Sequence, residues 1–194
     1  MIKCAVFDAD GTLIDSMGVW LKADEEYLRS KGRRLDPETY GKFSKMTYAQ
    51  SIAFVRRHYG LEDTEKKISE DIMKLVSDKY ENEVQVNEGV RELLQRLLDN
   101  GVPMAVATSN ERKLICRALR ANGLRRYFSY VVTCDETGCG KDNAEIFAHA
   151  AKLLGYTPSE TLVVEDNKEN IKAAKDAGFI AIHISQIGRL GFGK

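Results

Sequence analysis

The stretch FDADGTLIDS, Phe7–Ser16, places two acidic residues, Asp8 and Asp10, where an apolar run gives way to a Gly-Thr turn. The preceding residues, Cys4–Phe7, are apolar, as is typical of a strand buried on both faces. Asp-Gly is also a common turn sequence, so the two carboxylates could serve only the turn or could serve a reaction. The answer depends on which other polar residues the fold brings to the end of this strand.

The composition is that of an ordinary soluble globular protein. The 194 residues include 29 basic and 29 acidic ones, and this balance argues against a nucleic-acid-binding surface. Only a short apolar run precedes Asp8, unlike a signal peptide, and no segment approaches the ~18 apolar residues of a membrane span. Cys4, Cys116, Cys134 and Cys139 lack a disulfide-framework spacing, which favours free thiols. We therefore expect a cytoplasmic, monomeric protein with no nucleic-acid or membrane partner.

Five short apolar runs predict the strands of a parallel sheet. They are rich in Val, Ile, Ala and Phe with little polar alternation, as in strands covered by helices on both faces. They span residues 2–7, 104–108, 130–133, 162–164 and 179–184. An amphipathic helical pattern that ends at a glycine precedes each of the four later runs. These glycines are Gly101, Gly123, Gly155 and Gly178. This alternation predicts an α/β fold with a Rossmann-like, five-stranded parallel sheet.

The segment between the first two runs is the exception. From residue 16 to residue 87 the sequence shows helical stripes and no convincing strand, and Ser16 can cap the first of these helices. We therefore predict an α/β catalytic core of residues 1–15 and 88–194, interrupted by an all-helical cap of residues 16–87. The tail from Ser185 shows no periodicity, and we expect it to fray or pack loosely.

Polar residues follow four of the five predicted strands. Because ligands of open α/β sheets bind outside the carboxyl ends of the strands, these residues should converge. They are Asp8, Asp10, Thr108, Ser109, Asn110, Lys141, Glu165 and Asp166. Taken singly, each has an ordinary explanation as a turn, a helix cap or a solvated side chain. Four carboxylates in one crevice, however, repel each other unless a cation lies among them. Oxygen-only ligands of this kind suit Mg²⁺. No His or Cys belongs to this set of residues, which argues against zinc.

The same residues predict chemistry at a phosphoryl group. Carboxylates, Mg²⁺, a lysine and helix-start N–H groups together describe a phosphate site. A metal-bound carboxylate can be the nucleophile of a two-step transfer through an aspartyl-phosphate, and a second acid two residues later can exchange protons with the leaving group and water. Thr108 and Lys141 would hold the phosphoryl oxygens, with N–H groups of Ser109 and Asn110 assisting. The predicted substrate is a small phosphorylated metabolite.

The segment Asp8–Ser16 resembles the first motif of the haloacid dehalogenase superfamily of aspartate-nucleophile phosphotransferases. The other motifs follow in the family's order, at Thr108, at Lys141 and at Glu165-Asp166. The helical insertion is similar to the C1 cap of the β-phosphoglucomutase and phosphoglycolate-phosphatase branch. The resemblance covers nearly the whole core and rests on four motifs, whereas the cap matches in position and helicity only.

The resemblance implies a role for each matching residue. Asp8 would be the nucleophile and a Mg²⁺ ligand, and Asp10 would be the general acid/base and a ligand through its backbone carbonyl. Asp166 would be a further ligand, with Glu165 binding directly or through water. The phosphoryl group would be bound by Thr108 and Lys141. Dehalogenases and phosphonate hydrolases lack an acid at the position of Asp10, so its presence favours C–O–P chemistry.

The helical insertion supplies the candidates for substrate specificity. Lys45 and Tyr48 lie in the segment that takes the place of the family's specificity loop. Tyr48 falls where the phosphosugar mutase has an arginine for a second phosphate, which favours a phosphatase. Because Lys45 could replace that arginine, a β-phosphoglucomutase-like mutase remains the alternative. A phospho-acceptor signalling module is less favoured, since its phosphorylated Asp comes from a middle strand, and the middle strands here end in Thr108 and Cys134.

Overall fold

The computed structural model describes residues 2–43, 46, 48–138, 140–141 and 143–189. The chain divides into two compact units. Met1–Ser16 together with Val84–Lys194 form one, which we call the α/β unit, and Met17–Glu83 form the other, which we call the helical unit. In the described part of the chain, no helix has the length and apolar character needed to cross a membrane.

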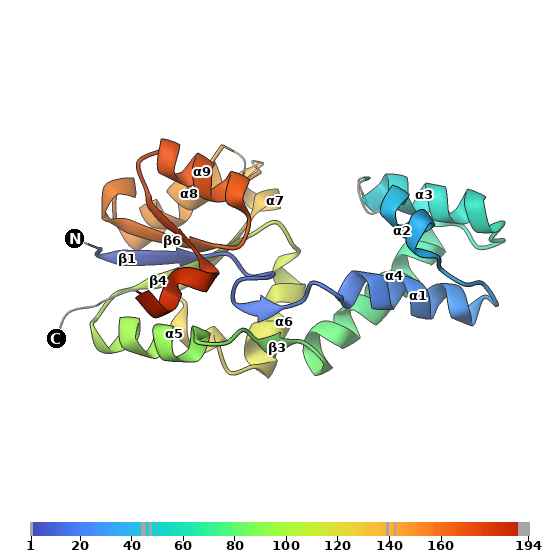
Figure 1. Cartoon of the computed structure of the whole chain (residues 1–194), viewed down its shortest axis with the longest axis horizontal. Helices are drawn as coiled ribbons and strands as arrows, with labels where there is room; N and C mark the ends of the chain where they lie inside the picture. Colours follow the sequence, from blue (N-terminus) through green and yellow to red (C-terminus); the bar gives the residue numbers. More distant parts are fainter. Residues whose placement is uncertain (1, 44–45, 47, 139, 142, 190–194) are drawn as a thin grey trace. The chain divides into compact units, whose positions relative to one another are not determined.

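The α/β unit is built on a five-stranded parallel sheet, which confirms the predicted fold class (Figure 1). Its strands are β1 (Cys4–Phe7), β4 (Met104–Thr108), β5 (Tyr130–Thr133), β6 (Thr161–Glu165) and β7 (Ile180–His183). They lie in the order β5-β4-β1-β6-β7, so the chain extends the sheet to one side of β1 before it returns to the other. Phe7 pairs with Val106 on one side and with Val164 on the other. The strand order therefore reverses beside β1, where a ligand crevice is expected.

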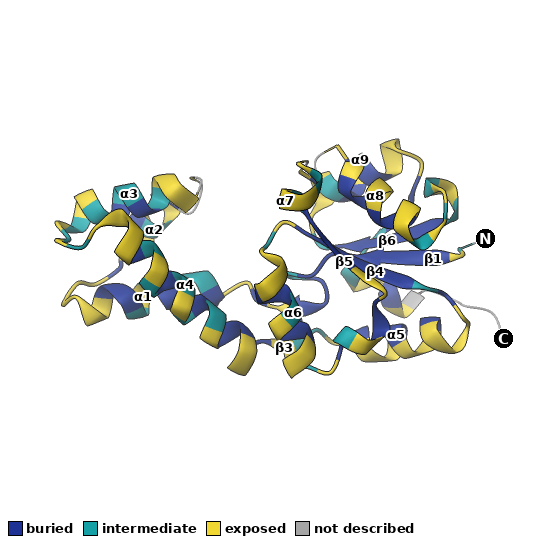
Figure 2. Ribbon diagram, turned by 180° about the vertical axis from the view of Figure 1, so that it is seen from behind, coloured by how far each residue is buried: buried dark blue, intermediate teal, exposed yellow. Residues whose placement is uncertain are grey.

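Helices cover both faces of this sheet. Helices α8 (Glu145–Leu154) and α9 (Lys168–Asp176) lie on one face, and α5 (Val90–Asp99) and α6 (Arg112–Ala121) lie on the other (Figure 1). Phe147 of α8 and Ala174 of α9 pack into one buried cluster with Val6 of β1. Figure 2 shows the buried strands between helices whose outer faces are exposed. The short elements of this unit are η1 (Arg125–Tyr127), α7 (Cys134–Thr137), η2 (Pro158–Glu160) and η3 (Ile184–Arg189).

Two short strands lie outside the predicted set. Strand β2 (Ile14–Asp15) pairs antiparallel with β3 (Gln85–Val86). The expectation of no strand between residues 16 and 87 is therefore wrong at β3, because a two-residue strand is too short to show a periodicity. Next to β3, the Asn87 side-chain amide donates to the carbonyls of Gly11 and Thr12, each at 2.9 Å. These contacts fix the loop that follows Asp10.

The part of the C-terminal tail that the structure describes, up to residue 189, is more ordered than its sequence suggests. Instead of fraying, Ile184–Arg189 form η3, and Ile187 is buried. Ile187 packs against Gly89, where a Cβ atom would lie 3.2 Å from its Cδ1. One buried apolar side chain produces no periodic pattern in the sequence, so the packing of Ile187 could not be predicted from the sequence.

The helical unit consists of α1 (Val19–Ser30), α2 (Pro37–Phe43), α3 (Tyr48–Tyr59) and α4 (Glu65–Asn82). Helices α1 and α4 pack together, and their buried residues include Ala23, Tyr27, Ile72 and Val76. Asp36 accepts a hydrogen bond from the Thr39 N–H at 2.8 Å and so begins α2. The unit therefore has its own apolar core, separate from that of the sheet.

Candidate active site

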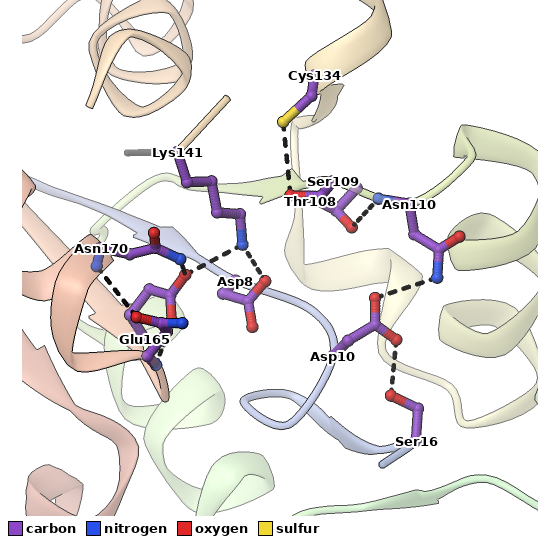
Figure 3. Close-up of polar contacts among 11 residues, drawn as sticks. Asp8, Asp10, Ser16, Thr108, Ser109, Asn110, Cys134, Lys141, Glu165 and Asn170 are labelled. Atoms are coloured by element: carbon purple, nitrogen blue, oxygen red, sulfur yellow. Dashed lines mark hydrogen bonds and ion pairs between the residues drawn. The ribbon is translucent and has the colours of Figure 1, made fainter. Parts of the chain in front are cut away.

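The carboxyl ends of β1, β4 and β6 bring several of the predicted site residues together (Figure 3). Asp8 follows β1, Thr108 ends β4 and Glu165 ends β6. Lys141 comes from the loop between α7 and α8. All four side chains are buried, so their charges and hydrogen bonds must be balanced within the site.

Lys141 joins two of the carboxylates. Its Nζ forms an ion pair with Asp8 Oδ1 and another with Glu165 Oε1 at 3.2 Å. Burial disfavours the charged ammonium and would lower the pKa of Lys141, but the attraction of Asp8 and Glu165 outweighs burial and raises it. The side chain is therefore a fixed cation at the end of β1.

Glu165 is held as an anion by more than the lysine. Its Oε2 accepts a hydrogen bond from the Asn167 N–H, and its Oε1 accepts one from Asn170 Nδ2, both at 2.7 Å. Burial would raise the pKa of this carboxyl, but Lys141 and the two asparagine donors together lower it. The sequence reasoning missed Asn170, because nothing in the pattern of α9 distinguishes it from a surface residue.

Asp8 is the carboxylate whose environment is least satisfied. Burial raises its pKa to about 7 against the opposing attraction of Lys141, with Glu165 and Asp10 adding to the rise. Its Oδ2 is buried and has no hydrogen-bond partner in the part of the chain that the structure describes. A buried acceptor without a donor is costly, so this oxygen is suited to binding a cation or a reacting group.

Asp8, Glu165 and Asp166 form a cluster that could hold a metal ion. One carboxylate oxygen from each lies within 4.8 Å of the others. Burial, followed by the neighbouring Glu165, raises the pKa of Asp166. Three carboxylates and one lysine leave an excess of negative charge, and hard oxygen donors of this kind fit Mg²⁺. The orphaned Asp8 Oδ2 is an independent reason for a cation at this place.

The Asp10 carboxylate lies outside this cluster of three acids. Its Oδ1 accepts a hydrogen bond from Ser16 Oγ at 2.6 Å, and its Oδ2 accepts one from Asn110 Nδ2 at 3.4 Å (Figure 3). The resemblance assigns the backbone carbonyl of Asp10 to the metal, so that role stays a prediction. The expectation that Ser16 caps the first helix is wrong, because α1 begins at Val19 with Gly18 as its N-cap and the Ser16 hydroxyl binds Asp10 instead.

The segment after β4 is a loop rather than the start of a helix. Thr108 Oγ1 accepts a hydrogen bond from the Asn110 N–H at 3.0 Å, and α6 begins only at Arg112. The Asn110 N–H is therefore already used, whereas the Thr108 hydroxyl keeps its proton for donation. Ser109 Oγ lies 3.5 Å from Cys134 Sγ. The phosphate-binding roles of Thr108, Ser109 and Asn110 stay predictions.

Of the two candidate specificity residues, Lys45 lies outside the described residues. Tyr48 is the first residue of α3, and its ring packs edge-on against Trp20, with the ring centroids 5.7 Å apart. Its hydroxyl donates to the Ser69 carbonyl at 3.2 Å. Tyr48 is 38% exposed, so part of it can still contact a ligand.

Comparisons with known proteins agree on the family. The family model described as haloacid dehalogenase-like hydrolase matches residues 5–184. A phosphorylated carbohydrates phosphatase of Thermotoga maritima is 25% identical over 94% of this chain and 84% of its own length. A phosphoglycolate phosphatase of Pseudomonas syringae pv. tomato is 30% identical over 94% of this chain and 69% of its own.

A solved structure shows the same fold. The putative β-phosphoglucomutase from Thermotoga maritima matches with a TM-score of 0.85 and 21% identity, over 96% of each chain. At this identity the likeness supports the fold alone, whereas the family model and the phosphatase relatives match nearly the whole sequence. The chain therefore belongs to the haloacid dehalogenase-like hydrolases and is a phosphoric monoester hydrolase of that family.

Proposed function

We propose that this chain is a Mg²⁺-dependent phosphatase that hydrolyses a small phosphorylated metabolite through an aspartyl-phosphate at Asp8. The observation that carries the proposal is the state of the Asp8 carboxylate. One of its oxygens is bound by Lys141, and the other is buried without a hydrogen-bond partner among the described residues, beside Glu165 and Asp166. The phosphatases of phosphorylated carbohydrates and phosphoglycolate among the relatives support a substrate of this class.

The proposed reaction has two steps. An Asp8 oxygen forms a bond to phosphorus while the ester P–O bond breaks, and Asp10 gives its proton to the departing alkoxide. Asp10 then takes a proton from water, whose oxygen attacks phosphorus, so that inorganic phosphate leaves and the Asp8 carboxylate is restored. Lys141 and the Thr108 hydroxyl would hold the phosphoryl oxygens where negative charge accumulates.

Asp8, Glu165 and Asp166 would hold the metal, with the Asp10 carbonyl as the further ligand. Bound Mg²⁺ would offset the excess negative charge of the acids and of the phosphoryl group.

We also propose that the helical unit is the predicted cap and that Tyr48 contributes to substrate choice. Because Tyr48 is not an arginine, a second phosphate would lack its usual partner there. A phosphosugar mutase is therefore the alternative rather than the main proposal.

The decisive experiment compares Asp8→Asn with Asp15→Asn. Asp15 is the third acid of the same motif, is exposed in β2 and has no assigned chemistry, so it is a matched control. We expect hydrolysis of p-nitrophenyl phosphate with Mg²⁺ to fall at least ~10³-fold in Asp8→Asn and to stay within about twofold in Asp15→Asn. Wild-type turnover in a folded Asp8→Asn protein would overturn the mechanism.

Two further measurements separate the finer parts of the proposal. Mg²⁺ should raise the melting temperature of the wild-type protein, because a ligand that binds only the folded state stabilises it. The rise should shrink in Asp166→Asn, which removes one of the proposed ligands. Among phosphorylated metabolites, a phosphatase releases inorganic phosphate, whereas a mutase isomerises a hexose phosphate without releasing it.

A further inference from the structure

The helical unit contains a cavity that none of the proposed catalytic residues lines. Its volume is about 650 Å³, within the range of ~300–1,000 Å³ that is typical of small-molecule sites. One wall is the face of α1 that carries Leu21, Glu25 and Arg29, which are spaced one helical turn apart. The other walls are the segment between α1 and α2 and Tyr40 of α2.

Three arginines, Arg29, Arg33 and Arg34, line this cavity. Arg33 Nε donates to the Tyr59 carbonyl at 3.0 Å, which fixes the guanidinium and leaves its two terminal nitrogens for a ligand. Arg29 lies in the last turn of α1, where the helix dipole favours a cation. That explanation does not extend to Arg33 and Arg34, because α1 ends at Ser30.

Two of these arginines, Arg29 and Arg34, differ from several lysines of the same unit, which are paired with acids. Lys31, Lys67 and Lys79 each have a carboxylate oxygen within 2.8 Å. Arg29 and Arg34, by contrast, make no ion pair with any acid in the described part of the chain. The hydrogen bond and the charge of Lys79 are the main causes that lower the pKa of Glu26, and the Arg29 charge adds only a minor attraction to them. The planar guanidinium matches phosphate and carboxylate oxygens in pairs. A hollow with such groups on its rim is therefore suited to an anion.

The acids at the cavity offset two of these three charges and leave one positive charge in excess. Asp36 is engaged at the start of α2, where it accepts from the Thr39 N–H. Glu25 is the other acid, so three arginines face two carboxylates. Leu21, Leu35 and Tyr40 make the remaining surface largely apolar, which would suit the body of an organic ligand rather than a bare ion.

We propose that this cavity is a second ligand site, which binds an organic phosphate through Arg29, Arg33 and Arg34 and holds its apolar part against Leu21 and Tyr40. The site is built wholly from the helical unit and uses none of the residues proposed for hydrolysis. It therefore goes beyond the proposed function, and the failure of either proposal leaves the other standing.

The test uses the full chain and a probe that resists hydrolysis, adenosine 5′-(β,γ-imido)triphosphate, with binding measured by calorimetry. The variant Arg29→Gln/Arg34→Gln removes two of the three cavity cations, and both residues are exposed, so the fold should be kept. Arg57→Gln/Lys66→Gln is the matched control, because it removes the same charge from exposed residues of the same unit outside the cavity. Amide NMR shifts locate the bound probe on the sequence.

We expect the dissociation constant to rise at least about tenfold in the cavity variant and less than about twofold in the control. Amide shifts should concentrate in residues 29–40. Tripolyphosphate, which carries the charge without an apolar body, should bind more weakly than the nucleotide analogue. Equal weakening in both double variants would overturn the site, as would shifts confined to residues 8–16 and 108–110. Equal binding of tripolyphosphate would overturn the apolar contact.

Discussion

The two units each bury a lysine between two carboxylates, and the comparison shows what makes one of them a site. Lys141 of the α/β unit and Lys79 of the helical unit are each 7% exposed. Lys141 pairs with Asp8 and Glu165, which are themselves buried. Lys79 pairs with Glu26 and Glu83, whose side chains are 40% and 44% exposed. Water can satisfy the acids around Lys79, whereas the acids around Lys141 depend on the protein and on what binds there.

The pKa shifts follow the same division. For Lys79 the hydrogen bond to Glu26 is the main cause of its raised pKa. For Lys141 the largest influence is burial, which opposes the charged form and is overcome only by Asp8 and Glu165. The burial of the partners, rather than the lysine itself, is therefore the feature that indicates function.

The largest effect is expected from Lys141→Met, which breaks the buried arrangement. Removing the Lys141 ammonium group leaves Asp8 and Glu165 as buried carboxylates without the cation that pairs with both of them. The free energy of unfolding should therefore fall by about 3–5 kcal/mol. Both acids would then have raised pKa values in the folded state, which means that the loss grows as the pH rises. Loss of a group that holds the phosphoryl oxygens should also lower kcat by about 10²–10³.

Urea unfolding and p-nitrophenyl phosphate hydrolysis measure the two effects of Lys141→Met. The exposed Lys168, which begins α9, gives the control variant Lys168→Met. A folded Lys141→Met protein with unchanged turnover would show that this lysine holds no reacting group.

The two lysines also mark the limit of what the sequence could predict. Lys141 was predictable because polar residues that follow apolar strands must converge at one edge of a parallel sheet. Its individual partners, and the donation from Asn170 to Glu165, were not predictable, because contacts between side chains leave no periodic signal. Lys79 was not predicted at all, because its partner Glu26 lies 53 residues away in the sequence. The sequence around Lys79 also shows the pattern of an ordinary helix face exposed to solvent. The same limit applies to β2 and β3.

A second, smaller effect is expected at Asp24 of α1, a partly buried acid for which no cation partner is described. Burial raises its pKa to about 7. Because the pKa is higher in the folded than in the unfolded state, the wild-type protein loses stability as the pH rises from about 4 to about 7. Asp24→Asn should therefore raise the free energy of unfolding by about 1–3 kcal/mol at about pH 8 and change it little at about pH 4.

Thermal or urea unfolding at the two pH values tests the Asp24 prediction. The control is Glu81→Gln, which neutralises an exposed acid of α4 and should show no such pH dependence. If Asp24→Asn had the same effect at both pH values, the substitution would act through packing rather than through charge. The contrast between the acids that pair with Lys141 and the partly buried Asp24, which lacks such a partner among the described residues, would then fail.

The smallest effect is expected from Lys79→Met, which sharpens the comparison most directly. Glu26 and Glu83 are exposed enough to be hydrated once the lysine is gone, so the free energy of unfolding should fall by about 1 kcal/mol or less. The hydrogen bond from Lys79 lowers the pKa of Glu26 in the folded state. The stabilisation is therefore present above the unfolded pKa of Glu26 and fades as the pH falls, so the cost of the variant should vanish in acid. Turnover should stay within about twofold. A loss of stability as large as that of Lys141→Met would mean that the burial of the partner acids is not what separates the two lysines.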